Sequence, residues 1–193
     1  MRSLLAIILA LSTLSVHAAD RYVRPGAAGN GSGTDWSNAY PSLPSTLNRG
    51  DTYWLADGSY GSRAFSDPMS GTAVITLKKA TPAAHGTNTG WSDAYGGGQA
   101  TFADMNFATG YYVIDGAKRN ENNWADSTAY GIRNSGSLYS SRLSSSSGAC
   151  ADNLTFRYID VGASVGTGVS SASSSGLYLG GFGGGALACE NWT

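Results

Sequence analysis

The chain has 193 residues, with 12 lysines and arginines against 13 aspartates and glutamates, so its net charge is −1 at pH 7. This balance argues against a nucleic-acid partner, which a basic surface would attract. Only 13% of residues are charged, 27 are glycine and 41% are hydrophobic, which argues against a helix-rich enzyme and a disordered chain and favours short strands joined by turns.

Residues 1–18 have the pattern of a secretory signal peptide. Arg2 supplies positive charge, residues 4–14 are mostly apolar, and small residues around Ala18 suit cleavage after it. We therefore expect export and a secreted location, extracellular or periplasmic. The apolar stretch is shorter than the about 20 residues that span a bilayer, so we expect no membrane span once the signal is removed.

Residues 19–60 do not follow the repeat that comes after them. Residues 30–34 favour turns, residues 41–47 suit one helical turn, and residues 52–56 suit a strand. A repeat array needs an atypical first unit, because an open core end and an unpaired strand edge recruit other chains. We interpret residues 19–60 as an N-terminal cap together with the first strand.

A strand-like phrase then recurs at nearly constant spacing through residues 61–193. Its copies begin at Ile75, Tyr112, Leu154 and Trp192, with separations of 37, 42 and 38 residues. A period in this range is typical of solenoids, propellers and arrays. The four starting residues are predicted to stack in one column. Because the fourth phrase begins at the penultimate residue, we expect the set of repeats to be incomplete, that is, truncated at the C-terminus.

The pattern within each period favours a parallel β-helix. Residues 154–157 alternate apolar and polar side chains, and residues 159–161 restart the alternation one position out of step, which indicates a bend between two sheets. A further run beginning with Gly131 or Gly176 implies about three short strands per turn. Helical repeats are disfavoured by the β-branched and aromatic content. The spacing of a leucine-rich horseshoe and the Gly-His and Trp-Asp dipeptides of a propeller do not occur.

Four stretches resemble bacterial right-handed parallel β-helix proteins of the pectate-lyase-like superfamily: residues 33–40 (GTDWSNAY), 50–60 (GDTYWLADGSY), 112–116 (YVIDG) and 152–156 (DNLTF). The resemblance covers nearly the whole chain after the signal peptide. It implies an all-β fold, a right-handed parallel β-helix solenoid with an N-terminal cap. It also implies a polysaccharide lyase-like protein that acts on or binds an extracellular acidic polysaccharide or cell-surface glycan. The alternative is a non-catalytic surface, adhesin or matrix protein.

Three charged residues are predicted to share one column on successive turns, namely Lys78, Asp115 and Arg157. One interpretation is a surface ladder in which neighbouring unlike charges support the stacking. The other is a polysaccharide groove. Lyases of the resembled family use Lys or Arg as the base and often calcium, which makes Lys78 and Arg157 candidate catalytic residues and Asp115 a candidate substrate-binding residue. Calcium needs six to eight oxygen ligands, and no compact run of Asp and Asn supplies them, so no metal ligand is assigned.

Two tryptophans are further candidates for substrate binding. Trp91 and Trp124 lie in predicted loops, where an indole can stack on a sugar ring. A tryptophan in a glycine-rich loop also commonly anchors the loop to the coil beneath it. Both interpretations are open for Trp91 and Trp124.

The two cysteines precede strand phrases by similar offsets. Cys150 lies four residues before Leu154, and Cys189 lies three before Trp192. Adjacent strands are about 4.8 Å apart, within the Cα separation that a disulfide allows. A Cys150–Cys189 disulfide is one expectation for an exported chain. Two free thiols, or pairing with another cysteine, are the alternatives.

Overall fold

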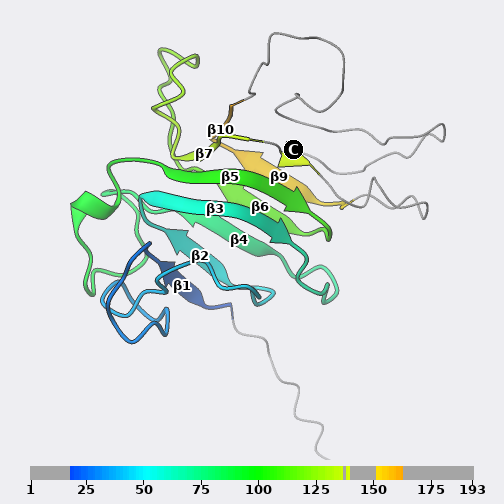
Figure 1. Cartoon of the computed structure of the whole chain (residues 1–193), viewed down its shortest axis with the longest axis horizontal. Helices are drawn as coiled ribbons and strands as arrows, with labels where there is room; N and C mark the ends of the chain where they lie inside the picture. Colours follow the sequence, from blue (N-terminus) through cyan, green and yellow to red (C-terminus); the bar gives the residue numbers. More distant parts are fainter. Residues whose placement is uncertain (1–17, 137, 140–150, 163–193) are drawn as a thin grey trace, which may run out of the picture.

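The computed structural model describes residues 18–136, 138–139 and 151–162. Within these residues the regular structure is almost entirely β, with a single 3-10 turn at Asp93–Tyr95. The strands pair in parallel and form two sheets (Figure 1). The predicted all-β class is therefore confirmed. Most of the predicted signal peptide, both cysteines and Trp192 lie outside the described residues.

Sheet A contains five strands in the order β1-β2-β4-β6-β9. Its register aligns Ile75 with Tyr112 and Tyr112 with Leu154. The predicted column is thus confirmed for these three residues. The strand bounds are β1 Asp20–Val23, β2 Thr52–Leu55, β4 Ile75–Lys79, β6 Tyr112–Asp115 and β9 Leu154–Arg157.

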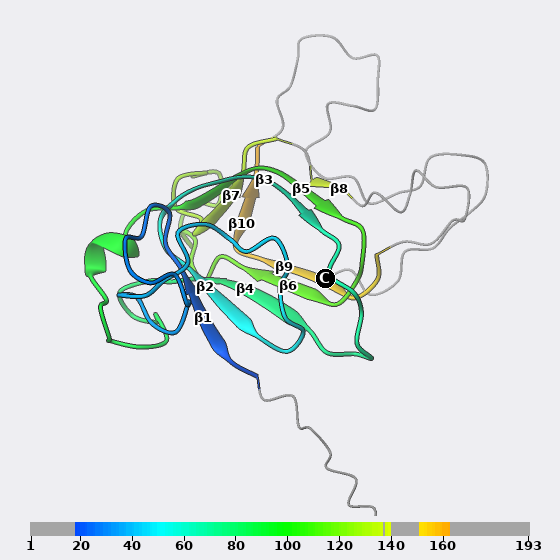
Figure 2. The ribbon, with the colours of Figure 1, turned by 60° about the horizontal axis from the view of Figure 1, so that its bottom comes forward.

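Sheet B has the order β10-β7-β5-β3, and the short strand β8 also pairs with β5. From β2 onward the chain passes back and forth between the sheets, so β2, β4 and β6 each reach the next strand of sheet A by way of sheet B (Figure 2). The long strand β5 spans the positions of both β7 and β8. The winding from β6 to β8 therefore has three short strands, as predicted, while the described strands form two sheets. The bounds are β3 Gly58–Phe65, β5 Ala100–Phe107, β7 Ile132–Asn134, β8 Leu138–Tyr139 and β10 Ile159–Val161.

The bend predicted from the shift in alternation lies at Tyr158. This residue has a φ of 51° and separates β9 in sheet A from β10 in sheet B. A left-handed backbone conformation reverses the alternation of side chains, because it breaks the extended geometry that alternation requires. Ala117, which follows β6, has a φ of 62° and marks a similar bend one winding earlier.

The core lies between the sheets. Every second side chain of a sheet A strand points inward and is buried, as the pattern of β4 shows. Inward rings from sheet B meet them, and Phe65 stacks on Phe107 with ring centroids 4.5 Å apart. The fully buried members of this core include Leu55, Ile75, Leu77, Phe102, Met105, Ile114 and Leu154.

Residues 24–51 cover the edge of β1 that faces away from β2. The Tyr22 N–H donates to the Gly33 carbonyl, and the Tyr40 N–H donates to the Tyr22 carbonyl. The helical turn expected at residues 41–47 is wrong, because this segment contains only bends. Pro44 disfavours helical geometry at the residue before it, and the Leu47 N–H donates to the Asp67 carboxylate at 2.6 Å instead of closing a turn.

Truncating one inward and one outward residue of β6 tests this packing. Ile114 is fully buried between its strand neighbours Leu77 and Phe156, whereas Val113 is half-buried between Thr76 and Thr155 on the outer face. We expect Ile114→Ala to lower the free energy of unfolding by about 2–5 kcal/mol. The matched Val113→Ala change should cost about 1 kcal/mol or less. Urea denaturation measures both, and equal losses would contradict the assigned faces.

Candidate functional site

The three predicted charged residues do lie in one column of sheet A. Lys78 is the register partner of Asp115, and Asp115 is the partner of Arg157. Trp54 and Tyr22 continue the column toward β1. We call these five residues the outer column. Its two aromatic members are buried, whereas Lys78 and Asp115 are half-buried and Arg157 is exposed.

The contacts in the outer column differ from a simple ladder of ion pairs. The Lys78 ammonium lies 4.8 Å from the centre of the Trp54 ring, and the Asp115 carboxylate accepts the Ala117 N–H at 2.8 Å. An ion pair between outward charges of neighbouring strands occurs in sheet B instead, where Arg133 meets Asp160 at 3.4 Å. The outer column therefore leaves charge available to an external group.

An exposed aromatic stack lies beside the end of the outer column. The Arg119 guanidinium lies 4.1 Å from the centre of the Trp124 ring and 5.4 Å from that of Tyr158. Trp124 is 61% exposed and Tyr158 is 38% exposed. Because Tyr158 follows Arg157 in the chain, the aromatic stack of Arg119, Trp124 and Tyr158 adjoins the charged end of the column.

The guanidinium of the aromatic stack is held in place from the side. Arg119 makes two hydrogen bonds to the Glu121 carboxylate, at 2.9 and 3.1 Å. This contact holds the pKa of Glu121 below its ordinary value. The Tyr130 hydroxyl also donates to the Trp124 carbonyl at 2.9 Å. Sequence reasoning found Trp124 but missed Arg119 and Tyr158, since only the fold brings the residues 117–131 against the bend after β9.

Trp91 lies in a different environment from Trp124. Its ring stacks on His85 with centroids 4.2 Å apart and lies 4.9 Å from buried Trp36. Its indole N–H donates to the Asp93 carboxylate at 2.9 Å. These contacts pin the residues 81–95 against the sheet, which is the loop-anchoring interpretation of a tryptophan in this segment.

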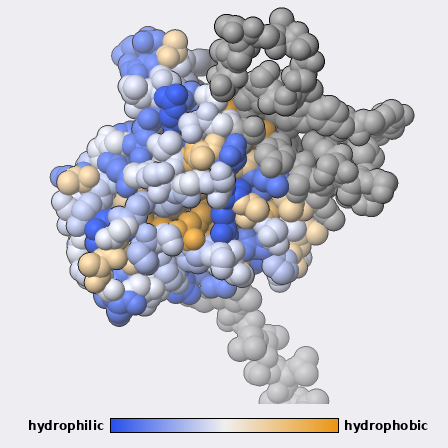
Figure 3. All heavy atoms as spheres, viewed as in Figure 1, coloured by the Kyte–Doolittle hydropathy of each residue, from blue (hydrophilic) through white to orange (hydrophobic). Residues whose placement is uncertain are grey.

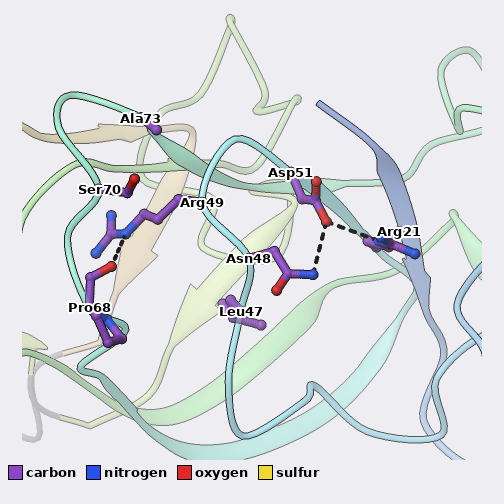
Figure 4. Close-up of a pocket in the computed structure, with 8 residues that line it drawn as sticks. All are labelled: Arg21, Leu47, Asn48, Arg49, Asp51, Pro68, Ser70 and Ala73. Carbon is purple, nitrogen blue, oxygen red and sulfur yellow. Dashed lines mark hydrogen bonds and ion pairs between the residues drawn. The ribbon is translucent and has the colours of Figure 1, made fainter. Parts of the chain in front are cut away.

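A pocket of about 470 Å³ opens where the strands of sheet A begin (Figure 4). None of the sequence-predicted site residues lines it, because its walls come from β1, the cap and the loop before β4, which lie outside the repeated phrases. The lining residues are Arg21, Leu47, Asn48, Arg49, Asp51, Pro68, Ser70 and Ala73.

Arg49 is the most heavily bonded side chain of the pocket wall. It is 8% exposed, and its guanidinium lies 4.6 Å from the centre of the Tyr112 ring. Its five N–H groups reach backbone carbonyls of two neighbouring windings and two hydroxyls, so its donors are used within the protein. The acceptors are the carbonyls of Asp67, Pro68, Gly110 and Tyr111 and the hydroxyls of Thr109 and Tyr112.

Two buried carboxylates accompany this arginine. Asp67 accepts the Tyr112 hydroxyl at 2.9 Å, and burial raises the pKa of Tyr112. Asp51, 3% exposed, accepts the Ala19 N–H and the Arg21 Nε, both at 3.0 Å. Buried charges without such partners would be costly, and here the partners are in place.

Lys79 is the one lysine of the described chain with no exposed side-chain surface. Its ammonium lies 2.6 Å from the Asp57 carboxylate and also donates to the Ala80 carbonyl. Burial lowers the pKa of Lys79 despite the carboxylate. A lowered pKa suits a general base, but the buried position keeps a polymeric substrate away from this amine. The two residues predicted from the sequence as candidate bases, Lys78 and Arg157, lie instead on the outer face of sheet A, where Lys78 is half-buried and Arg157 is exposed.

The visible surface is mostly hydrophilic, with apolar residues in small areas (Figure 3). Within residues 18–136, 138–139 and 151–162, no three His, Cys, Asp or Glu residues are grouped closely enough to hold a metal ion. In the same part of the chain, no helix has the length and apolar character needed to cross a membrane.

Comparisons of the chain with protein family models, with curated proteins and with solved structures gave no match. The function has therefore to be inferred from the residues and their geometry.

The buried Lys79–Asp57 pair should respond unequally to the loss of either partner. We expect Asp57→Asn to lower the free energy of unfolding by about 3–5 kcal/mol at pH 7, because it leaves the buried ammonium uncompensated. Lys79→Met should cost about 1 kcal/mol or less, since Asp57 keeps some contact with water. Chemical denaturation of both variants measures the difference.

The pH dependence of the Asp57→Asn variant provides a control. Asp57→Asn removes the carboxylate that raises the pKa of Lys79, so the folded-state pKa lies further below 10.5 in the variant than in the parent chain, and over a wider pH range the unfolded variant binds more protons than the folded variant. Stability must then rise with pH in this window. The loss in free energy of unfolding caused by Asp57→Asn, relative to the parent chain, should therefore become smaller as the pH is raised from 7 toward 10. If the loss in free energy of unfolding is the same at every pH, lost packing and not the buried charge causes it.

Proposed function

We propose that this chain is an exported right-handed parallel β-helix protein that binds an extracellular acidic polysaccharide. The binding surface is formed by the outer column and the aromatic stack. The alternation of the chain between two parallel sheets supports the helical winding, and the signal-like residues 1–18 support export.

The exposed aromatic stack is the observation that carries this proposal. Trp124 has 61% of its surface exposed, so part of its indole is open to an external group. Arg119 covers part of Trp124 and, through Glu121, is fixed in orientation. An aromatic ring fixed in this way binds the apolar face of a sugar ring at little cost in conformational entropy.

The charges beside the aromatic stack favour an acidic ligand. Arg157 is exposed and has no ion-pair partner in the described part of the chain. A guanidinium binds a carboxylate through two parallel hydrogen bonds, so Arg157 is placed to bind a sugar carboxylate next to Trp124 and Tyr158. Lys78 adds positive charge two strands away, and Asp115 between them can accept a sugar hydroxyl.

Binding to soluble polymers tests this proposal. Polygalacturonate and alginate are titrated into the full chain, with neutral dextran as the comparison. We expect Trp124→Ala to weaken binding of the acidic polymers about three- to tenfold through lost stacking. Arg157→Gln should weaken it similarly and reduce its dependence on salt. Arg133→Gln, on the outer face of sheet B, is the matched control and should bind normally.

The same experiment separates the alternatives. Equal affinity for dextran, or normal binding by both Trp124→Ala and Arg157→Gln, would overturn the proposed surface. Ultraviolet absorbance of an unsaturated product, lost in Lys78→Met or Arg157→Gln and promoted by calcium, would extend binding to lyase activity. No binding to any acidic polymer would favour a surface or matrix protein without this ligand.

A further inference from the structure

We propose that the pocket where the strands of sheet A begin is a second binding site, which takes a small hydroxylated carboxylate such as a single sugar acid. None of its lining residues belongs to the outer column or the aromatic stack, although the pocket and the outer column both involve strands of sheet A. The inference goes beyond the polysaccharide surface and does not depend on it.

Hydrogen bonds within the protein preorganise the walls of the pocket. One wall is fixed by Arg49, whose donors are bound to carbonyls of neighbouring windings. The opposite wall is fixed by Asp51, which accepts hydrogen bonds from Arg21 and Asn48 (Figure 4) and from the Ala19 N–H. Fixed walls reduce the ordering cost of binding. Arg49 and Asp51 therefore shape the pocket rather than contact the ligand with free donors.

Three polar side chains of the lining keep unused hydrogen-bonding capacity within the described chain. Arg21 bonds to Asp51 through Nε only, which leaves Nη1 and Nη2 available. Asn48 uses its amide nitrogen on Asp51 and keeps its side-chain oxygen. Ser70 brings a hydroxyl from an exposed position of the loop before β4. A planar pair of guanidinium donors matches a carboxylate, while an amide oxygen and a hydroxyl match sugar hydroxyls.

The rest of the lining suits the carbon skeleton of such a ligand. Leu47, Pro68 and Ala73 give the pocket its apolar walls. Its volume of about 470 Å³ lies in the range of small-molecule sites, which combine apolar walls with few polar groups. Because Arg21 shares its charge with Asp51, the attraction for an anion is moderate, and we expect a dissociation constant of about 1 mM.

Titration of the full chain with glucuronate, followed by NMR, tests the site, with glucose and acetate as comparisons. We expect glucuronate to bind at least fivefold more tightly than either, because only it offers both the carboxylate and the hydroxyls. Ala73→Trp fills the pocket while leaving Arg21 and Asp51 themselves in the sequence, and it should weaken binding at least fivefold. Arg21→Lys keeps the charge but loses the planar fork and should weaken it similarly.

Controls distinguish this site from the polysaccharide surface. Trp124→Ala should leave glucuronate binding unchanged, and Ala73→Trp should leave polymer binding unchanged. Thermal unfolding of each variant verifies folding, and Ser70→Leu serves as the blocking variant if Ala73→Trp does not fold. Glucose binding as tightly as glucuronate, or unchanged glucuronate binding in Arg21→Lys and a folded blocking variant, would overturn the proposal.

Discussion

The in-register parallel pairing of sheet A is the constraint on which the other features depend. From β2 to β9 the partners follow one another without a shift, whereas the pairing of β3 with β5 in sheet B contains two irregularities. A slip of one residue would exchange the inward and outward faces, exposing Leu77 and Ile114 and burying Lys78 and Asp115. The cost of that exchange fixes the core and, at the same time, aligns the outward charges in one column.

The loops between successive strands differ in length, and the bends between the sheets keep the register of sheet A the same in spite of this difference. Gly110 and Gly116 lie at bends where a Cβ would collide with the carbonyl oxygens of Asp152 and Tyr158 in the next winding. The windings are therefore in close backbone contact at these corners, and the extra residues of each period are placed outside them. The residues 117–131 leave the corner at Gly116 in this way, which is why Arg119 and Trp124 reach the bend at Tyr158 from a different winding.

The sequence predicted the repeated features well and the local ones poorly. The alignment of Ile75, Tyr112 and Leu154 followed from spacing, because a buried strand repeats the same alternation wherever it recurs. The helical turn at residues 41–47 was wrong because the Leu47 N–H bonds to Asp67, a partner 20 residues away that no local pattern reveals. The pocket and Arg119 escaped prediction for the same reason: their partners come from segments that do not repeat.

Some charged residues of the described chain make internal hydrogen bonds, and others face solvent. Only 13% of residues are charged, and several of these charged side chains are buried and make hydrogen bonds within the protein. Arg49 near the start of the sheet A strands and Lys79 at the end of β4 donate to backbone carbonyls at the bends, those of Gly110 and Ala80. Charges of this kind maintain the corners and are closed to solvent. Arg157 on the outer face and the Nη1 and Nη2 groups of Arg21 make no such internal bonds in the described chain, and each of the two proposed sites uses one of these guanidinium groups to bind a carboxylate.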